Sequence, residues 1–135
     1  MWPMTIRHHI VFATRRGILL LPETGAQLRL NPVECTLYRL FLAHPEGIPA
    51  DSLPGHWHEL CRIYASESCF DDTPLRDNAM ESLCAESKIV FYSNISRIKR
   101  KFVAALGARK ASAYIIKRDK NGVYRTRAVL VKTPL

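Results

Sequence analysis

Acidic side chains are almost missing from the C-terminal end of this 135-residue chain. Residues 88–135 contain a single acid, Asp119, beside thirteen of the twenty lysines and arginines, whereas residues 1–87 contain seven bases and eleven acids. The formal net charge of +8 therefore arises from the C-terminal region. Charge of one sign gathered in one region is typical of a protein that binds a polyanion, and nucleic acid is the commonest such partner.

Long apolar runs are also missing. Those at residues 18–21 and 128–131 are among the longest, and they are far too short to cross a bilayer. Near the N-terminus, His8-His9 and Arg15-Arg16 interrupt the apolar stretch that a secretory signal needs, and no small-residue cleavage site follows. We therefore expect a cytoplasmic protein with no membrane partner, folded as a single domain.

The sequence motifs of several enzyme classes are absent. No GxxxxGKS or GxGxxG loop and no GxSxG nucleophile elbow occurs, and the only adjacent carboxylates, Asp71-Asp72, fall in an expected loop. We therefore expect no enzymatic activity and no cofactor. A catalytic triad assembled from distant residues stays open, because spacing along the chain does not test it.

One group of histidines and cysteines makes a metal site an alternative. His56-Trp57-His58 lies close to Cys61, with Cys69 and Cys84 further along the chain. The spacing fits neither a zinc finger nor the HExxH helix of metalloproteases, and these cysteines and Cys35 form no CxxC pair. We expect exposed loop histidines, reduced thiols and no bound metal.

Short alternating runs dominate the first thirty residues. Residues 8–13, 17–22 and 26–30 are separated by turn-like clusters, which predicts a small antiparallel β-meander. The pattern then becomes helical. Asn31-Pro32-Val33-Glu34 combines a capping residue, a proline and a glutamate in the positions that begin a helix, which ends near His44. We expect a second helix from about residue 51 to 65 and a third that begins at Thr73-Pro74.

A helix over residues 88–106 is the strongest prediction, and Gly107 ends it. Its apolar residues recur at spacings of four, three, four and four, so they form one stripe: Phe91, Ile95, Ile98, Phe102 and Leu106. We expect polar and basic side chains to face away from that stripe: Ser93, Asn94, Arg97, Arg100 and Lys101. A solvated face with no ligand is the simpler interpretation of this basic surface.

The chain ends in a predicted β-hairpin over residues 113–132. Asn121-Gly122 favours a two-residue type I′ turn, which would place Arg118 opposite Arg125, on one face with Lys120 and Arg127. Like charges opposed across two strands repel, and an anionic ligand would offset that repulsion. Bases on an edge strand also discourage aggregation without binding anything.

These groups match the chemistry of duplex DNA. The major groove is about 12 Å wide and admits one α-helix. Arg reads guanine with two hydrogen bonds, Asn reads adenine in the same way, and Ser and Lys hold phosphate oxygens. A basic hairpin beside such a helix can reach the adjacent minor groove or the backbone.

Three stretches resemble two known families. Residues 94–102, NISRIKRKF, resemble the recognition-helix signature of the winged-helix effector domains of bacterial response regulators, and residues 122–125 resemble part of their wing motif. Residues 30–48 resemble more closely a family of short bacterial proteins of unknown function. The first resemblance implies that Asn94, Arg97, Arg100 and Lys101 contact the groove or phosphates and that residues 117–127 form the wing.

We therefore expect an α+β fold, a winged helix-turn-helix with an N-terminal antiparallel meander (1–30), a core of three to four helices (31–106) and a C-terminal hairpin wing (107–135). The expected function is binding of double-stranded DNA as a bacterial transcriptional regulator. The alternative is a protein-interaction module for an acidic partner, and a homodimer is possible. The predicted DNA contacts are Ser93, Asn94, Arg97, Arg100, Lys101, Lys117, Arg118, Lys120, Arg125 and Arg127.

Overall fold

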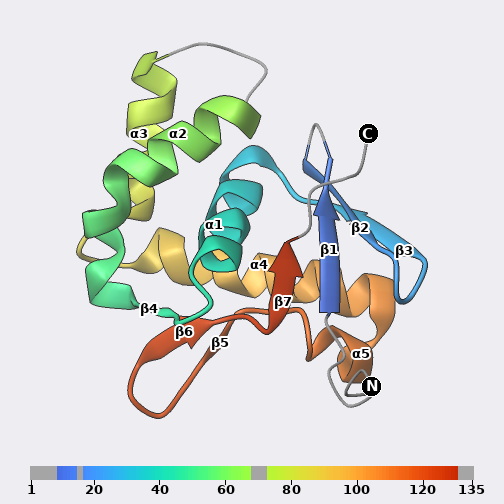
Figure 1. The fold of residues 1–135 in the computed structure, drawn as a ribbon. Helices are drawn as coiled ribbons and strands as arrows, with labels where there is room; N and C mark the ends of the chain where they lie inside the picture. Colours follow the sequence, from blue (N-terminus) through green and yellow to red (C-terminus); the bar gives the residue numbers. More distant parts are fainter. Residues whose placement is uncertain (1–8, 15–16, 68–72, 131–135) are drawn as a thin grey trace, which may run out of the picture.

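The computed structural model describes residues 9–14, 17–67 and 73–130. They form an α+β fold in which helix α1 lies between a four-stranded sheet on one side and helices α2 and α3 on the other, while the long helix α4 crosses behind it (Figure 1). The predicted α+β class is confirmed. Among the described helices, none is both long and apolar enough to cross a membrane.

The predicted N-terminal meander is present. Strands β1 (His9–Ala13), β2 (Ile18–Leu21) and β3 (Ala26–Arg29) pair in antiparallel fashion. Strand β7 (Ala128–Leu130) lies against the other edge of β1 and runs parallel to it, so the sheet order is β3-β2-β1-β7. The two ends of the described chain therefore meet in one sheet.

Helix α1 (Pro32–Ala43) begins as its sequence predicts. The Asn31 side chain accepts a hydrogen bond from the Glu34 backbone N–H at 2.8 Å, and the Glu34 carboxylate accepts one from the Asn31 N–H at 3.0 Å. This reciprocal pair satisfies two of the backbone donors that a helix start leaves unpaired. It also fixes the Glu34 side chain at the first turn of α1.

The remaining helices are η2 (Ala50–His56), α2 (Trp57–Glu67), α3 (Thr73–Leu83), α4 (Ile89–Leu106) and α5 (Ala108–Ala111). The expected second helix is a 3-10 turn followed by a true α-helix. Pro54 lies inside the 3-10 segment, where it has no N–H to donate and restricts the residue before it. The α-helix therefore begins only at Trp57.

A second, three-stranded sheet joins the middle of the chain to its end. Its order is β4-β6-β5, with β4 (Ile48–Pro49), β5 (Lys117–Arg118) and β6 (Val123–Arg125) all antiparallel. The predicted single hairpin over residues 113–132 is wrong in extent: the chain leaves it after β6 and enters the N-terminal sheet as β7. Residues 131 and 132 lie outside the described part of the chain.

The hairpin turn also differs from the prediction. The Gly122 N–H donates to the Asp119 carbonyl at 3.1 Å and the Asp119 N–H to the Val123 carbonyl at 2.9 Å, so three residues form the loop. Only Gly122 has a positive φ, of 81°, whereas a type I′ turn needs two such residues. The register therefore moves by one, and Arg118 lies opposite Tyr124 rather than Arg125.

An aromatic cluster joins the two ends of the core. The Tyr38 ring of α1 lies 5.2 Å from that of Phe102 in α4, and Phe102 stacks on Tyr114 at 5.8 Å. The Tyr38 hydroxyl donates to the Tyr114 carbonyl at 2.6 Å, and the Thr126 hydroxyl donates to the same oxygen at 2.8 Å. These contacts fix the C-terminal segment against α1 and α4, and so place the β5–β6 hairpin beside α4.

Gly47, in the loop between α1 and β4, packs closely against β6. Its φ is +91°, and an added Cβ would lie 2.5 Å from Val123 Cγ1 and 2.9 Å from the Tyr124 carbonyl oxygen. We expect Gly47→Ala to lower the free energy of unfolding by about 2 kcal/mol, because backbone strain and overlap add. Urea denaturation measures this. Gly55→Ala is the matched control, since nothing lies within 4 Å of its added Cβ, and an equal loss in both variants contradicts the explanation.

Candidate nucleic-acid interface

Helix α4 has one buried side and one exposed side. Phe91, Ile98 and Phe102 of the predicted stripe are buried, and Ile95 and Leu106 are half-buried. On the other side Arg97 and Arg100 are exposed, as predicted, whereas Ser93 is half-buried. The amphipathic character of this helix is therefore confirmed for these residues.

Asn94 is an exception, and the prediction that it points outward is wrong. Its side chain is buried, with 1% of the residue exposed, and its amide Nδ2 donates to the Val90 carbonyl at 2.8 Å. Asn94 lies three residues after Phe91 and four before Ile98, so helical geometry places it on the buried side. It does not reach a DNA base in this conformation.

Two other predicted contacts already have an anionic partner within the chain. Lys101 Nζ donates to Glu34 Oε1, and Arg97 Nε lies 3.3 Å from Glu34 Oε2. The Glu34 side chain is 1% exposed, whereas those of Arg97 and Lys101 are 43% and 39% exposed. The buried carboxylate thus holds the bases of α4 against the first turn of α1 and partly neutralises them.

The exposed side of α4 includes residues that the sequence analysis did not select. Ser96 and Lys99 are exposed, and so are Ile89 and Tyr92, at 68% and 45%. Lys99 adds a base one residue before Arg100. The signal for Ser96 was its position three residues after Ser93 and four before Arg100. Tyr92 and Lys99 lie four residues before and three after Ser96, which places them beside it on the helix surface.

All five predicted bases of the C-terminal segment are exposed: Lys117, Arg118, Lys120, Arg125 and Arg127. Arg125 pairs with Asp119 at 2.9 Å, and Lys117 Nζ donates to the Ser112 hydroxyl. Hydrogen bonds from the backbone N–H groups of Val123 and Asn121, together with the Arg125 charge, hold the pKa of Asp119 below its usual value. Asp119 therefore orders the loop, and it neutralises Arg125, one of the five bases in residues 117–127.

Aromatic contacts join the hairpin to the first half of α4. The Tyr124 ring of β6 lies 5.1 Å from Phe91, edge to face, and 6.5 Å from Tyr92. Burial raises the pKa of the Tyr124 hydroxyl, and the charge of Arg118, its partner across the ladder, acts to lower it. Arg118 is thus positioned beside the exposed N-terminal half of α4.

Comparison with protein-family models, curated proteins and solved structures finds no match to this chain.

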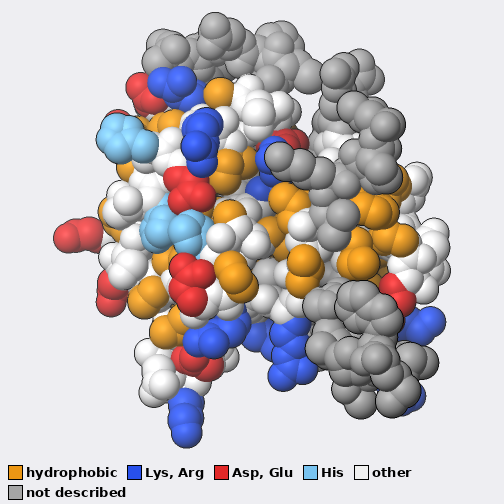
Figure 2. All heavy atoms as spheres, viewed as in Figure 1, with side chains coloured by type: hydrophobic (Ala, Val, Ile, Leu, Met, Phe, Trp, Pro, Cys, Tyr) orange, Lys and Arg blue, Asp and Glu red, His pale blue; other side chains and the backbone are white. Residues whose placement is uncertain are grey.

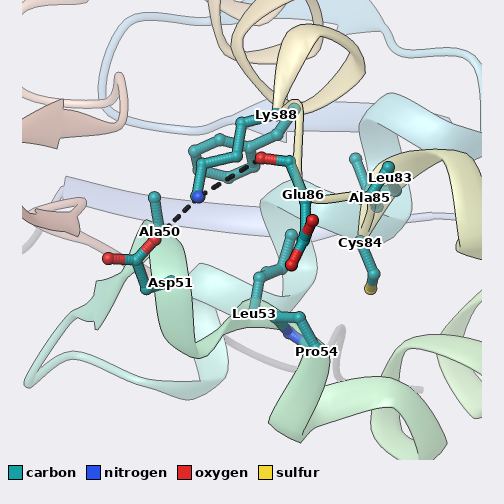
Figure 3. A pocket seen from close by; sticks show the side chains of 10 residues that line it. Ala50, Asp51, Leu53, Pro54, Leu83, Cys84, Ala85, Glu86 and Lys88 are labelled. Carbon is teal, nitrogen blue, oxygen red and sulfur yellow. Dashed lines mark hydrogen bonds and ion pairs between the residues drawn. The ribbon is translucent and has the colours of Figure 1, made fainter.

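A pocket of about 270 Å³ lies where α4 begins. It is lined by η2 and by the connection between α3 and α4, and Lys88 spans it to reach Asp51 at 2.7 Å (Figure 3). The hydrogen bond to Asp51 raises the pKa of Lys88, and Lys88 takes the left-handed conformation with φ 58°. The ion pair therefore ties the start of α4 to η2, in a pocket smaller than most small-molecule sites.

The prediction of exposed loop histidines is only partly right, because His56 ends η2 half-buried beside Glu59 and His58 lies in α2. His58 is exposed, Cys61 and Cys84 are half-buried free thiols, and Cys69 lies outside the described residues. Burial raises the pKa of the Cys84 thiol to about 11, which disfavours the thiolate that binds metals. Within the described part of the chain, a different set of possible ligands gathers: His44, His56 and Glu59.

Proposed function

We propose that this chain is a winged-helix protein that binds double-stranded DNA as a bacterial transcriptional regulator, without catalytic activity. The topology supports the fold assignment. A short strand, β4, follows α1 and pairs with a hairpin, β5–β6, that comes after the longest helix, α4. Such a helix followed by a hairpin is the arrangement in which the helix enters the major groove and the hairpin acts as the wing.

The single observation that carries the DNA-binding proposal is the position of the hairpin beside α4. Tyr124 packs against Phe91 and Tyr92, so the basic hairpin lies against the first half of α4, about two helical turns before Lys99 and Arg100. Among the described residues, six exposed bases of these elements have no acidic partner: Lys99, Arg100, Lys117, Arg118, Lys120 and Arg127. They are the groups proposed to hold phosphates or read bases, with Ser93, Arg97, Lys101 and Arg125 in supporting positions.

Arg100→Ala tests the role of α4. Because Arg100 is exposed and has no ion pair within the described chain, its loss removes a contact to DNA while leaving the fold unchanged. We expect the affinity for a duplex to fall by about 1–2 kcal/mol. Fluorescence anisotropy with a labelled mixed-sequence duplex at low salt measures this.

Arg62→Ala is the matched control for that experiment. Arg62 is also exposed, but it lies on α2, which packs against α1 and α3. Its removal changes the net charge by the same amount and leaves α4 intact. If both variants lose the same affinity, the binding is a response to net charge and the assignment of α4 as the recognition helix is wrong.

A protein-interaction module for an acidic partner is the second candidate, and one observation favours it. Ile89 and Tyr92 expose apolar surface at the start of α4. Tyr92 lies beside Tyr124, whose partner across the hairpin is Arg118. Exposed aromatic and aliphatic side chains next to arginines are typical of the centre of a protein interface. The two functions differ in whether the chain binds a DNA duplex at low salt.

A further inference from the structure

Three side chains with metal-binding atoms converge where α1, η2 and α2 meet. His44 follows the last residue of α1, His56 ends η2, and Glu59 lies in the first turn of α2. Their ligand atoms all lie within 4.8 Å of one another. Figure 2 shows histidine side chains at the molecular surface between acidic ones. In Figure 1, drawn from the same side, α4 passes behind α1.

The distances suit a tetrahedral ion. His44 Nε2 lies 2.8 Å from Glu59 Oε1, and His56 Nδ1 lies 3.4 Å from the same oxygen. Zinc binds nitrogen and carboxylate oxygen at about 2.0–2.2 Å, so tetrahedral ligand atoms are separated by about 3.3 Å. The two imidazole rings meet edge to face, with centroids 4.7 Å apart. Small side-chain rotations would therefore bring three ligands around one ion.

Glu46 supplies the support that a zinc-binding histidine usually has. Its Oε2 lies 3.0 Å from His44 Nδ1, on the opposite side of the ring from Glu59. A carboxylate in this position accepts the Nδ1–H and leaves Nε2 with its lone pair directed at the ion. Metal-binding histidines almost always have such a partner, and its loss weakens binding by about 10–100-fold.

We propose that His44 Nε2, His56 Nδ1 and Glu59 form a Zn²⁺ site, oriented by Glu46 and open to water at a fourth position. Two imidazole nitrogens favour zinc over magnesium or calcium, which prefer oxygen ligands. The ion would join the end of α1 to the start of α2. This site is separate from the proposed DNA-binding surface and does not depend on it.

The alternative is an ionic contact without metal. Hydrogen bonding to Glu59, and then to Glu46, raises the pKa of His44, so a proton can occupy the position proposed for zinc. The hydrogen bonds from His44 and His56 lower the pKa of Glu59, against the effect of its burial. Zinc and the proton then compete for the same nitrogen.

Isothermal titration of the tag-free chain with Zn²⁺ at neutral pH tests the proposal. We expect the wild type to bind one ion per chain. His56→Gln should lose more than about tenfold in Zn²⁺ affinity. Glu46→Gln removes only the supporting carboxylate and should lose about 10–100-fold in Zn²⁺ affinity. His58→Gln is the matched control and should bind like the wild type, because His58 is exposed and outside the cluster.

Two further readouts separate this site from other causes. Zn²⁺ should raise the melting temperature of the wild type and of His58→Gln, but not of His56→Gln, because the ion binds the folded state. With Co²⁺ in place of Zn²⁺, the absorption should lack thiolate-to-metal charge transfer. Equal Zn²⁺ affinity in the wild type and His56→Gln, no binding at all, or a thiolate band would each overturn the proposal.

Discussion

Raising the salt concentration from about 50 mM to about 200 mM is expected to weaken binding to a mixed-sequence duplex by about a thousandfold. Each phosphate that a base neutralises releases a counterion, so the logarithm of the affinity falls with the logarithm of salt at a slope of about −0.9 per contact. The six exposed bases without an acidic partner in the described chain give a slope of about −5. Anisotropy titrations at several salt concentrations measure it.

The same titrations separate the two candidate functions. Lys120→Ala should reduce the slope by about 1, because Lys120 is an exposed base in the hairpin loop and is proposed to touch a phosphate. Lys110→Ala, an exposed base in α5, should leave the slope unchanged. If the chain does not bind a duplex even at low salt, the interaction-module function replaces DNA binding. If the affinity for a duplex changes little with salt, the six exposed bases do not contact phosphates.

The elements that sequence predicts well are those that depend on neighbouring residues. The capping pair of Asn31 and Glu34 and the apolar stripe of α4 are set by spacings of three and four residues, and both are present. The strands of the meander are similarly local, because each is bounded by its own turn. Their prediction needed no knowledge of what lies across the core.

Asn94 and Lys101 are two residues of α4 whose surroundings the local spacing did not predict. They are seven residues apart, which is two helical turns, so they share a side of α4 that borders the apolar stripe. Polarity suggested that both face solvent. Lys101 instead reaches Glu34, sixty-seven residues earlier in the chain, and Asn94 bonds within its own helix. A polar residue at the edge of an apolar stripe signals an internal partner, but only the tertiary structure identifies it.

The hairpin turn is set by local contacts of Asp119, whereas the pairing of β7 and the histidine cluster depend on tertiary contacts. The Asp119 carboxylate accepts hydrogen bonds from the loop backbone and favours three loop residues over two, which moved the register by one. The apolar run at residues 128–131 was equally compatible with continuing the hairpin or pairing with β1. His44 and His56 meet only because α1 packs on α2, and nothing in their spacing announces it.

Lys101→Ala is expected to lower the free energy of unfolding by about 3 kcal/mol, because it removes the main partner of a buried carboxylate. The Glu34 side chain is 1% exposed, and Lys101 Nζ and the Asn31 N–H share its Oε1. Arg97 remains near Oε2 at 3.3 Å, which keeps the loss below that of a fully unpaired charge. Urea denaturation measures the change. Lys99→Ala, two residues earlier and exposed, should change the free energy by less than about 0.5 kcal/mol.

Adding Glu34→Gln to Lys101→Ala should recover most of the lost stability. The glutamine amide oxygen can still accept the Asn31 N–H at the helix start, while the buried negative charge that needed Lys101 is gone. Together with Glu34→Gln alone, the double variant completes a mutant cycle that isolates the coupling between the two side chains. If it is no more stable than Lys101→Ala alone, Lys101 does not stabilise the fold through Glu34.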